Sequence, residues 1–275
     1  MYKFLFITLF IFILNSPTAI AQTSTTTTII LSPHFDDAVL PLGGMLAQAN
    51  NQKKVITVFS GKPEKPQKTW WDLISGFLSS DTAVSSRVEE NKNALKPFNV
   101  TEINLGFLDE QYRKKGTTTD IEDQVKKKII GVINDRSHNE HLNIYFPAYF
   151  GPKITHKDHL MIHDIALDLI KSGQFHDVSW YMYEDMPYTL IYYKKHKEDL
   201  FDYLKQNTSG FELKEKDILL SFSDLDMMSK SIQSYTSQVK AFKFIGNPLK
   251  RVVEFAKTHC KDGACEKVYE VNVKQ

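Results

Sequence analysis

Short apolar runs and longer amphipathic stretches alternate along the chain, in an order that predicts strands separated by helices. The strand-like runs are rich in β-branched and aromatic residues, and they cover residues 28–31, 55–59, 103–105, 143–146 and 179–183. The helix-like stretches between them cover residues 37–50, 87–96, 121–134 and 158–170. This alternation predicts an α/β fold, a Rossmann-like and mainly parallel sheet with helices on both of its faces.

One connecting segment is longer than a compact domain usually needs. Residues 60–85 contain prolines and the pair Trp70-Trp71. Segments of this length are often functional. The two tryptophans fit a platform on which a sugar ring stacks and fit ordinary loop packing equally well, so the sequence leaves both interpretations open.

The last part of the chain, from about residue 218, is less regular. A helical stretch at 224–242 is followed by Cys260 and Cys265, which flank an Asp-Gly turn signal, and by strand-like residues 268–271. In an exported protein this spacing favours a disulfide that closes a hairpin, with two free thiols as the alternative. We therefore predict a C-terminal extension with a disulfide-closed hairpin.

The N-terminus has the pattern of a secretory signal peptide. Residues 4–14 are almost wholly apolar, and Ala19-Ile20-Ala21 has the small-x-small pattern of a cleavage site. The apolar run is short for an uncleaved membrane anchor, which is the alternative. We predict a signal peptide over residues 1–21, an exported protein that is periplasmic or secreted, and no stable membrane span after cleavage.

Composition and charge narrow the class of protein. Hydrophobic residues make up 42% of the chain and aromatic residues 12%, enough for a sizeable core. The formal net charge is only +1. A nearly neutral chain gives no electrostatic reason to expect a nucleic-acid partner or an anionic membrane surface.

Two short motifs supply the residue types of a hydrolytic metal site. Pro33-His34-Phe35-Asp36-Asp37 directly follows the first predicted strand, and His156-Lys157-Asp158-His159 begins a predicted helix. Together they offer two imidazoles and a carboxylate as metal ligands, and a further carboxylate and imidazole for proton transfer. The first motif lies at the carboxyl end of a strand, where open α/β sheets bind ligands.

The adjacent carboxylates of the first motif have a plainer alternative role. An Asp between a strand and a helix often caps the helix, but only one of two neighbours can do so. If Asp37 joins His34 at a metal, Asp36 remains free to accept a proton from water. Two histidines and a carboxylate suit Zn²⁺ and Fe²⁺ alike.

The second motif also allows more than one interpretation. His156 and His159 share a helix face because they are three residues apart. Asp158 can orient one of these rings or complement the helix dipole. His163 is interpreted as a helix-face residue, because the glutamate of a His-Glu-x-x-His zinc motif is missing. Residues 184–185 follow a strand and can reach the site, but the sequence does not fix this.

The first motif and its surroundings, residues 32–44, resemble the signature of the PIG-L/LmbE-like deacetylases, zinc enzymes that remove acyl groups from N-acetylglucosamine-type amides. Further stretches resemble the family in the same order along the chain. They are Arg87-Val88-Glu89-Glu90, Leu105-Gly106-Phe107-Leu108-Asp109, His156 to His159 and Tyr183 to Tyr188. The resemblance covers roughly residues 29–188, and the motifs are specific when taken jointly.

The resemblance implies roles for the residues of the two motifs. The implied zinc ligands are His34, Asp37 and His159. Asp36 is implied as the general base. His156 is implied to stabilise the oxyanion or to donate a proton, with Asp158 orienting it.

The resemblance also bears on substrate binding. Arg87 is implied to face the substrate, and we take Trp70 and Trp71 as further candidates for substrate contact. The chain departs from the family pattern at Phe35, which replaces a proline, and at Ala38, which replaces a glutamate. Neither position is an expected ligand or base, so these changes bear on pocket shape and substrate choice.

The sequence thus predicts an exported, metal-dependent deacetylase that hydrolyses the N-acetyl amide of an amino sugar in a glycan or small glycoconjugate. The predicted parts are the signal peptide, a deacetylase domain over residues 22–215, and an extension over residues 216–275 packed on it. One alternative is a carbohydrate-binding protein on the same scaffold without catalysis. The other is an amidase acting on a different N-acyl conjugate.

Overall fold

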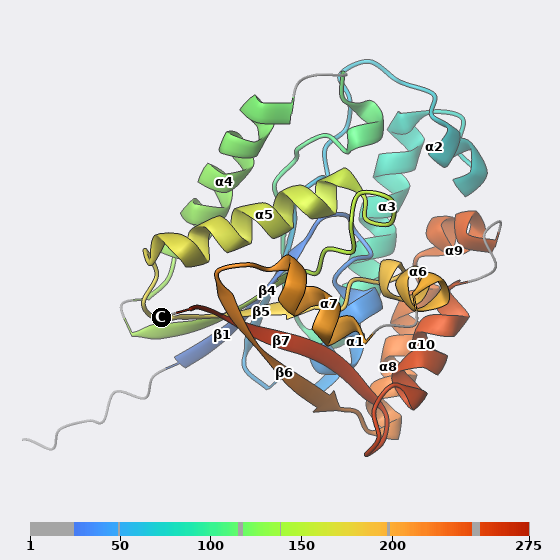
Figure 1. Cartoon of the computed structure of the whole chain (residues 1–275). Coiled ribbons are helices and arrows are strands. Elements are labelled where there is room, and N and C mark those ends of the chain that lie inside the picture. The colour runs from blue at the N-terminus through green and yellow to red at the C-terminus, as the bar shows by residue number, and fades with distance from the viewer. Residues whose placement is uncertain are drawn as a thin grey trace, which may run out of the picture.

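The computed structural model places a mixed β-sheet at the centre of the molecule (Figure 1). It describes residues 25–274, apart from residues 49, 115–117, 138, 197–198 and 244–247. The predicted signal peptide, residues 1–21, lies outside the described residues. Within the described part of the chain, no helix is long and apolar enough to cross a membrane.

Seven strands of the described chain form the sheet, in the order β3-β2-β1-β4-β5-β7-β6. The strands are β1 (Thr25–Ser32), β2 (Gln52–Thr57), β3 (Thr101–Asn104), β4 (Glu140–Pro147), β5 (Val178–Tyr183), β6 (Phe211–Leu219) and β7 (Cys265–Val273). Strands β1 to β5 are all parallel to one another, whereas β7 is antiparallel to both β5 and β6. The predicted mainly parallel sheet is confirmed, with an antiparallel edge added by the C-terminal strands.

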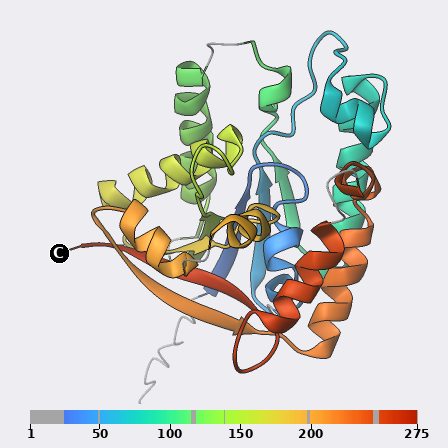
Figure 2. The ribbon, with the colours of Figure 1, turned by 45° about the vertical axis from the view of Figure 1, so that its right-hand side comes forward.

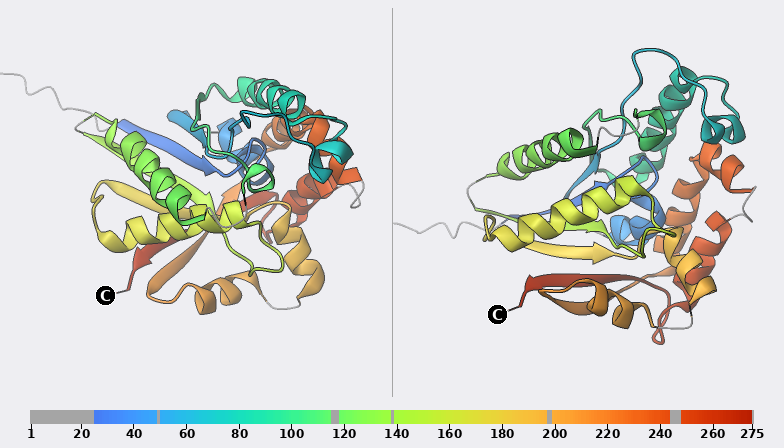
Figure 3. Two further views of the ribbon diagram at one scale, coloured as in Figure 1. Left: turned by 90° about the horizontal axis from the view of Figure 1, so that it is seen from above. Right: turned by 45° about the horizontal axis from the view of Figure 1, so that its top comes forward.

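Helices cover both faces of the sheet (Figure 3). They are α1 (Val39–Gln48), α2 (Trp70–Ser75), α3 (Ser80–Leu95), α4 (Thr118–Asn134), α5 (Lys157–Ser172), α6 (Tyr188–Lys195), α7 (Leu200–Asn207), α8 (Phe222–Gln233), α9 (Thr236–Lys243) and α10 (Pro248–Thr258), with short 3-10 turns at Lys96–Phe98 (η1) and Glu110–Tyr112 (η2). Alternate residues of β1 point to opposite cores, as a strand requires. Ile29 and Leu31 pack with α4 and α5, and Ile30 packs with α1 and α3.

The long segment at residues 60–85 is partly helical. Thr69 caps α2 through its side chain, which accepts a hydrogen bond from the Asp72 amide at 3.1 Å. Ser79 caps α3 in the same way, so this helix begins at Ser80, seven residues before the predicted start at residue 87. The early turns of α3 are mostly polar, and they therefore carry little of the apolar periodicity on which the prediction relied.

The Gly43-Gly44 pair in α1 allows a close approach of the C-terminal part of the chain. A Cβ atom at Gly43 would lie 2.8 Å from Met228 Cγ, and one at Gly44 would lie 2.5 Å from Leu220 Cδ2. The same turn is held by buried Glu266, whose carboxylate oxygens accept hydrogen bonds from the Gly44 and Met45 amides at 2.7 and 2.8 Å. The C-terminal strand therefore fixes the helix that follows the first motif.

The C-terminal extension belongs to the same sheet as the rest of the chain (Figure 2). The predicted boundary between residues 215 and 216 falls inside β6, and β7 lies between β5 and β6. The helical stretch predicted at 224–242 consists of two helices, α8 and α9, which are separated by Ser234 and Tyr235. The predicted disulfide is present: Cys260 and Cys265 are bonded and close a turn that leads into β7.

Candidate active site

The two predicted motifs meet at the carboxyl edge of the parallel strands, in a cavity of about 350 Å³. The first motif follows β1, and the second begins α5, which is reached from the neighbouring strand β4. The polar lining of the cavity includes His34, Asp36, Asp37, Asp109, His156 and His159. His34 and His159, which are 125 positions apart in the sequence, therefore line one site. This is the place expected for a motif that follows the first strand.

Three side chains converge on one point in this cavity. His34 Nδ1 lies 3.2 Å from Asp37 Oδ2 and 3.1 Å from His159 Nε2. His159 Nε2 lies 3.1 Å from the same Asp37 oxygen. Asp37 is itself oriented by the His34 amide, which donates to its Oδ2 at 2.7 Å. All three side chains are largely shielded from solvent, with the His34 side chain the most exposed at 19%.

This arrangement fits a divalent metal ion. Two imidazole nitrogens and one carboxylate oxygen are a common donor set for catalytic Zn²⁺ and for non-haem Fe²⁺. Ligand atoms about 2.0–2.1 Å from a tetrahedral centre lie roughly 3.3 Å from one another, close to the spacing seen here. Burial would lower the pKa of His159, but Asp185 and Asp37 outweigh it and raise this pKa to about 10. The site therefore favours positive charge between these side chains.

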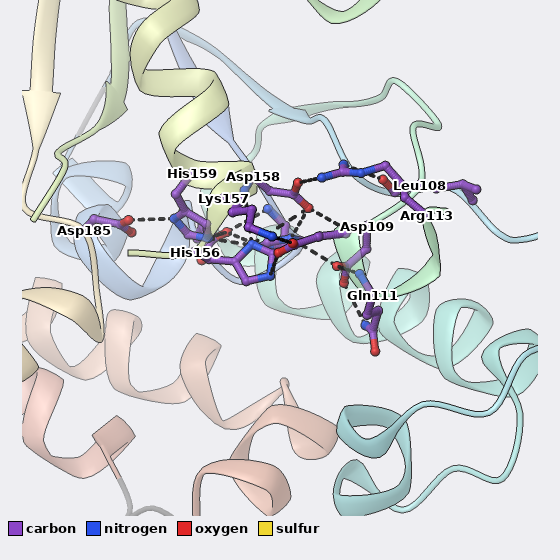
Figure 4. Close-up of polar contacts among 12 residues, drawn as sticks. Leu108, Asp109, Gln111, Arg113, His156, Lys157, Asp158, His159 and Asp185 are labelled. Carbon is purple, nitrogen blue, oxygen red and sulfur yellow. Dashed lines mark hydrogen bonds and ion pairs between the residues drawn. The ribbon is translucent and has the colours of Figure 1, made fainter. Parts of the chain in front are cut away.

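Asp185 is a site residue whose role the sequence did not fix. It follows β5, and its Oδ2 lies 2.6 Å from His159 Nδ1 (Figure 4). A carboxylate on the far nitrogen fixes the tautomer and orientation of a metal-binding histidine and leaves Nε2 free for the metal. Two signals in the sequence pointed to this residue: its position after a predicted strand, and the resemblance of Tyr183 to Tyr188 to a segment of the PIG-L/LmbE-like family.

Replacing Asp185 with Asn is expected to weaken metal binding about 10- to 100-fold, because the uncharged amide is a weaker partner for the His159 ring. The measurement is a chelator competition titration with Zn²⁺ on the purified variant and parent. Asp202→Asn on α7 is a matched control, since that side chain is 68% exposed and far along the chain from the motifs. Equal affinities in parent and D185N would show that Asp185 does not support the metal site.

Asp36 lies beside the three converging side chains and is not one of them. Its carboxylate lines the cavity, and the residue is only 5% exposed. Burial and the neighbouring Asp37 charge raise the pKa of Asp36 to about 7. The preceding carbonyl, that of Phe35, accepts a hydrogen bond from the Tyr235 hydroxyl at 3.0 Å, which fixes the loop between His34 and Asp36.

Asp158 pairs with a different histidine from the one predicted. Its Oδ2 lies 3.2 Å from His34 Nε2 but 3.9 Å from His156 Nδ1. Arg113 also donates to its other oxygen (Figure 4). The expected orientation of His156 by the Asp158 carboxylate is therefore wrong in this structure. The physical reason is that His156 caps α5, so that its Nδ1 accepts the Asp158 amide at 3.2 Å while the Asp158 side chain turns toward β1.

Comparison with known proteins identifies the family. Residues 29–170, just over half of the chain, match the GlcNAc-PI de-N-acetylase family, PIG-L. The chain belongs to this family. None of the curated proteins matches it closely enough to be informative.

Solved structures share the fold. The zinc-inhibited form of the teicoplanin deacetylase Orf2 is 24% identical, with a TM-score of 0.73 over 90% of this chain and 99% of that one. A triple mutant of a deacetylase from the teicoplanin biosynthetic pathway is 26% identical, with a TM-score of 0.72 over the same shares. The N,N'-diacetylchitobiose deacetylase of Pyrococcus horikoshii is 13% identical, with a TM-score of 0.57 over 89% and 83%.

In this PIG-L family member, Arg87 and Trp71 line the cavity, and Trp70 does not. Arg87 lines it, but its guanidinium is paired with buried Asp72 at 2.9 Å. Asp72 also accepts the Tyr112 hydroxyl at 2.7 Å. Trp71 lines the cavity, whereas Trp70 does not and is 67% exposed. Of the tryptophan pair, the structure therefore leaves Trp71 as the candidate for substrate contact.

His163 lies away from the three converging side chains, as the helix-face interpretation predicts. Its Nδ1 donates to the Pro147 carbonyl at 2.9 Å, and it is 5% exposed. Burial lowers the pKa of His163 to about 4. Below about pH 6.5 the His163 ring of the unfolded chain takes up a proton. In the folded protein the same ring stays neutral until the pH falls to about 4.

The free energy of unfolding is expected to fall by up to about 3 kcal/mol between pH 6.5 and pH 4 because of His163, since only the unfolded chain takes up this proton in that window. His163→Asn, which keeps a donor for the Pro147 carbonyl, should remove this part of the pH dependence. The measurement is urea unfolding of both proteins across this pH range. Parallel curves for parent and variant would contradict the assignment.

Proposed function

We propose that this protein is a metal-dependent deacetylase that hydrolyses the N-acetyl amide of an amino sugar. The observation that carries the proposal is the convergence of His34 Nδ1, Asp37 Oδ2 and His159 Nε2 within 3.2 Å of one another, with Asp36 beside them in one cavity. Membership of the GlcNAc-PI de-N-acetylase family supports the same activity. So does the 26% identity with a deacetylase of the teicoplanin pathway.

The chemistry divides between the ion and the protein. A Zn²⁺ or Fe²⁺ ion held by His34, Asp37 and His159 would lower the pKa of water and polarise an amide carbonyl. Asp36 accepts the proton of the attacking water, a role suited to a carboxyl whose pKa lies near neutrality. The same carboxyl then passes that proton to the nitrogen as the C–N bond breaks. The products are acetate and a free amino sugar.

His156 can stabilise the negative charge that develops on the amide oxygen. Burial lowers the pKa of His156, which favours the neutral ring. Its Nδ1 accepts the Asp158 amide, so the proton of the neutral ring is carried on Nε2. The His156 ring lines the cavity, and its Nε2 lies 3.4 Å from Glu110 Oε2. A neutral N–H donor beside a developing oxyanion is a common catalytic device.

The direct test is acetate release by the purified protein after loading with Zn²⁺ or Fe²⁺. N-acetylglucosamine, N,N'-diacetylchitobiose and small N-acetylated conjugates are offered separately, and acetate and free amine are both counted. Equal yields of the two from the parent, with none from His159→Ala, would support the proposal. A folded, metal-loaded parent that binds these sugars without releasing acetate would instead favour the carbohydrate-binding alternative.

Export is part of the same proposal. The apolar N-terminal run and the Ala19-Ile20-Ala21 site support it, and the Cys260–Cys265 disulfide is typical of oxidising compartments. N-terminal sequencing of protein recovered from expressing cells tests it. Gln22 as the first residue is the expected result, and retention of Met1 in the whole population would contradict it.

A further inference from the structure

A tyrosine from the C-terminal part of the chain reaches the backbone between a metal ligand and the proposed base. The Tyr235 hydroxyl donates a hydrogen bond to the Phe35 carbonyl at 3.0 Å, across 200 positions of the chain. Phe35 lies between His34 and Asp36, and the exposed fractions are only 1% for Tyr235 and 5% for Phe35. Tyr235 also lies outside residues 29–170, which match the family. Neither the motifs nor the family match therefore accounts for this contact.

The neighbouring carbonyl groups of the same loop are held by residues close to them in the sequence. The His34 carbonyl accepts a hydrogen bond from Ser32 Oγ at 2.6 Å. The Asp36 carbonyl accepts hydrogen bonds from the first two amides of α1 at 3.2 and 3.0 Å. The Phe35 carbonyl lies between these two and is held from a distance, by Tyr235. A buried carbonyl that loses its donor is costly, so this part of the loop depends on the remote hydroxyl.

The peptide group that Tyr235 holds joins Phe35 to Asp36. Rotation of this group changes the φ angle of Asp36, and that angle helps to set where the carboxylate points. The metal ligands of the loop have a separate support, because the His34 amide donates to Asp37 Oδ2 at 2.7 Å. The remote hydrogen bond therefore acts mainly on the base, and the local one acts on the ligands.

Tyr235 is itself held firmly in place. It lies between α8 and α9, and both of these helices pack beside α3 (Figure 1). Thr236 and Ser237, which follow it, are fastened to α3 because Glu90 accepts a hydrogen bond from each of their hydroxyls at 2.6 Å. The Tyr235 hydroxyl also lies 2.9 Å from Asn91 Oδ1 on α3. The donor is thus fixed before any substrate arrives.

We propose that Tyr235 is a positioning residue for the deacetylation, whose hydroxyl holds the Asp36 backbone so that the carboxylate faces the attacking water. This inference rests on the proposed function and adds to it a residue outside the two motifs. Because His34 and Asp37 are held within their own loop, loss of the Tyr235 hydroxyl should slow the chemical step without releasing the metal. A residue that only stabilised the fold would not separate these two effects.

Tyr235→Phe removes the hydroxyl and keeps the ring in the core. The test compares this variant with the parent, both loaded with Zn²⁺, on an N-acetylated sugar that the parent hydrolyses. We expect kcat to fall at least about tenfold, since a displacement of about 1 Å can slow catalysis roughly a hundredfold. KM, and the Zn²⁺ affinity from chelator competition, should match those of the parent. An unchanged kcat would overturn the proposal, and so would a loss of metal that accounts for the loss of activity.

Two further variants separate the hydrogen bond to the loop from other effects of the hydroxyl. Tyr183→Phe also deletes a buried hydroxyl that donates to a backbone carbonyl at 3.0 Å, that of Leu31 inside β1. It should lose stability as Y235F does and keep the kcat of the parent. Asn91→Leu removes the second acceptor near the Tyr235 hydroxyl and should also keep kcat. A loss of kcat in either variant equal to that in Y235F would overturn the assigned role.

Hydrogen exchange tests the loop without any activity. Exchange is followed by mass spectrometry in a peptide that covers residues 33–40, in the parent, Y235F and Y183F. Faster exchange in Y235F alone is expected, because the Asp36 amide belongs to the peptide group that loses its donor. Equal exchange in the parent and Y235F would overturn the proposal. Faster exchange in Y235F alone, with a metal-loaded parent that hydrolyses no amide, would retain the hold of Tyr235 on the loop and reject the proposed function.

Discussion

Replacing Asp36 with Asn is expected to lower kcat by about 10²- to 10⁴-fold while the bound metal stays in place. The amide of Asn cannot accept the proton of the attacking water, so only the chemical step loses its base. Asp36 contributes none of the three atoms that converge at the metal position, so metal content should not change. The measurements are steady-state deacetylation and elemental analysis of the same purified samples.

The near-isosteric D36N substitution is chosen because Asp36 is buried. Truncation to Ala would leave a small cavity at this position. Asp202→Asn, at an exposed position of α7, controls for the loss of one carboxylate elsewhere on the protein. An unchanged kcat in D36N would remove Asp36 from the mechanism. Loss of metal from D36N would instead place this carboxylate among the ligands.

Substituting either His34 or His159 with Ala is expected to remove the metal and reduce deacetylation to background. Each change removes one of three donor atoms that lie within 3.2 Å of one another. Changing His159 also leaves the buried Asp185 carboxylate without its partner, so this variant should lose some stability as well. The measurement is elemental analysis of the parent and both variants after loading with Zn²⁺ or Fe²⁺ and desalting.

His176→Ala is the matched control, because His176 is exposed, follows the opposite end of α5 from the second motif, and does not line the cavity. The parent and H176A should hold about one equivalent of metal, and H34A and H159A should hold almost none while remaining folded. If either histidine variant kept a full equivalent, the metal position inferred from the converging atoms would be wrong. Restoring a chelated parent with each ion in turn distinguishes zinc from iron.

The sequence by itself determined the local half of the candidate site. His34 and Asp37 are three residues apart in a loop that follows a buried strand, and the His34 amide bonds directly to the Asp37 carboxylate. Residues three positions apart in one loop cannot separate far, so a contact of this kind can be predicted from the sequence alone. The alternating α/β pattern and the Cys260–Cys265 pair are likewise local signals, and the structure contains both the predicted sheet and the disulfide.

Only the tertiary structure decided which remote residues meet. His159 reaches His34 across 125 positions because β1 and β4 are parallel neighbours, and Asp185 reaches His159 because β5 lies next to β4. Helix packing likewise put Trp71 on the cavity and Trp70 in solvent, although the two are adjacent. The partner of Asp158 changed from His156 to His34 for the same reason. A local pattern carries no information about which strand or helix becomes a neighbour, because that choice is made by burial of apolar surface across the whole chain.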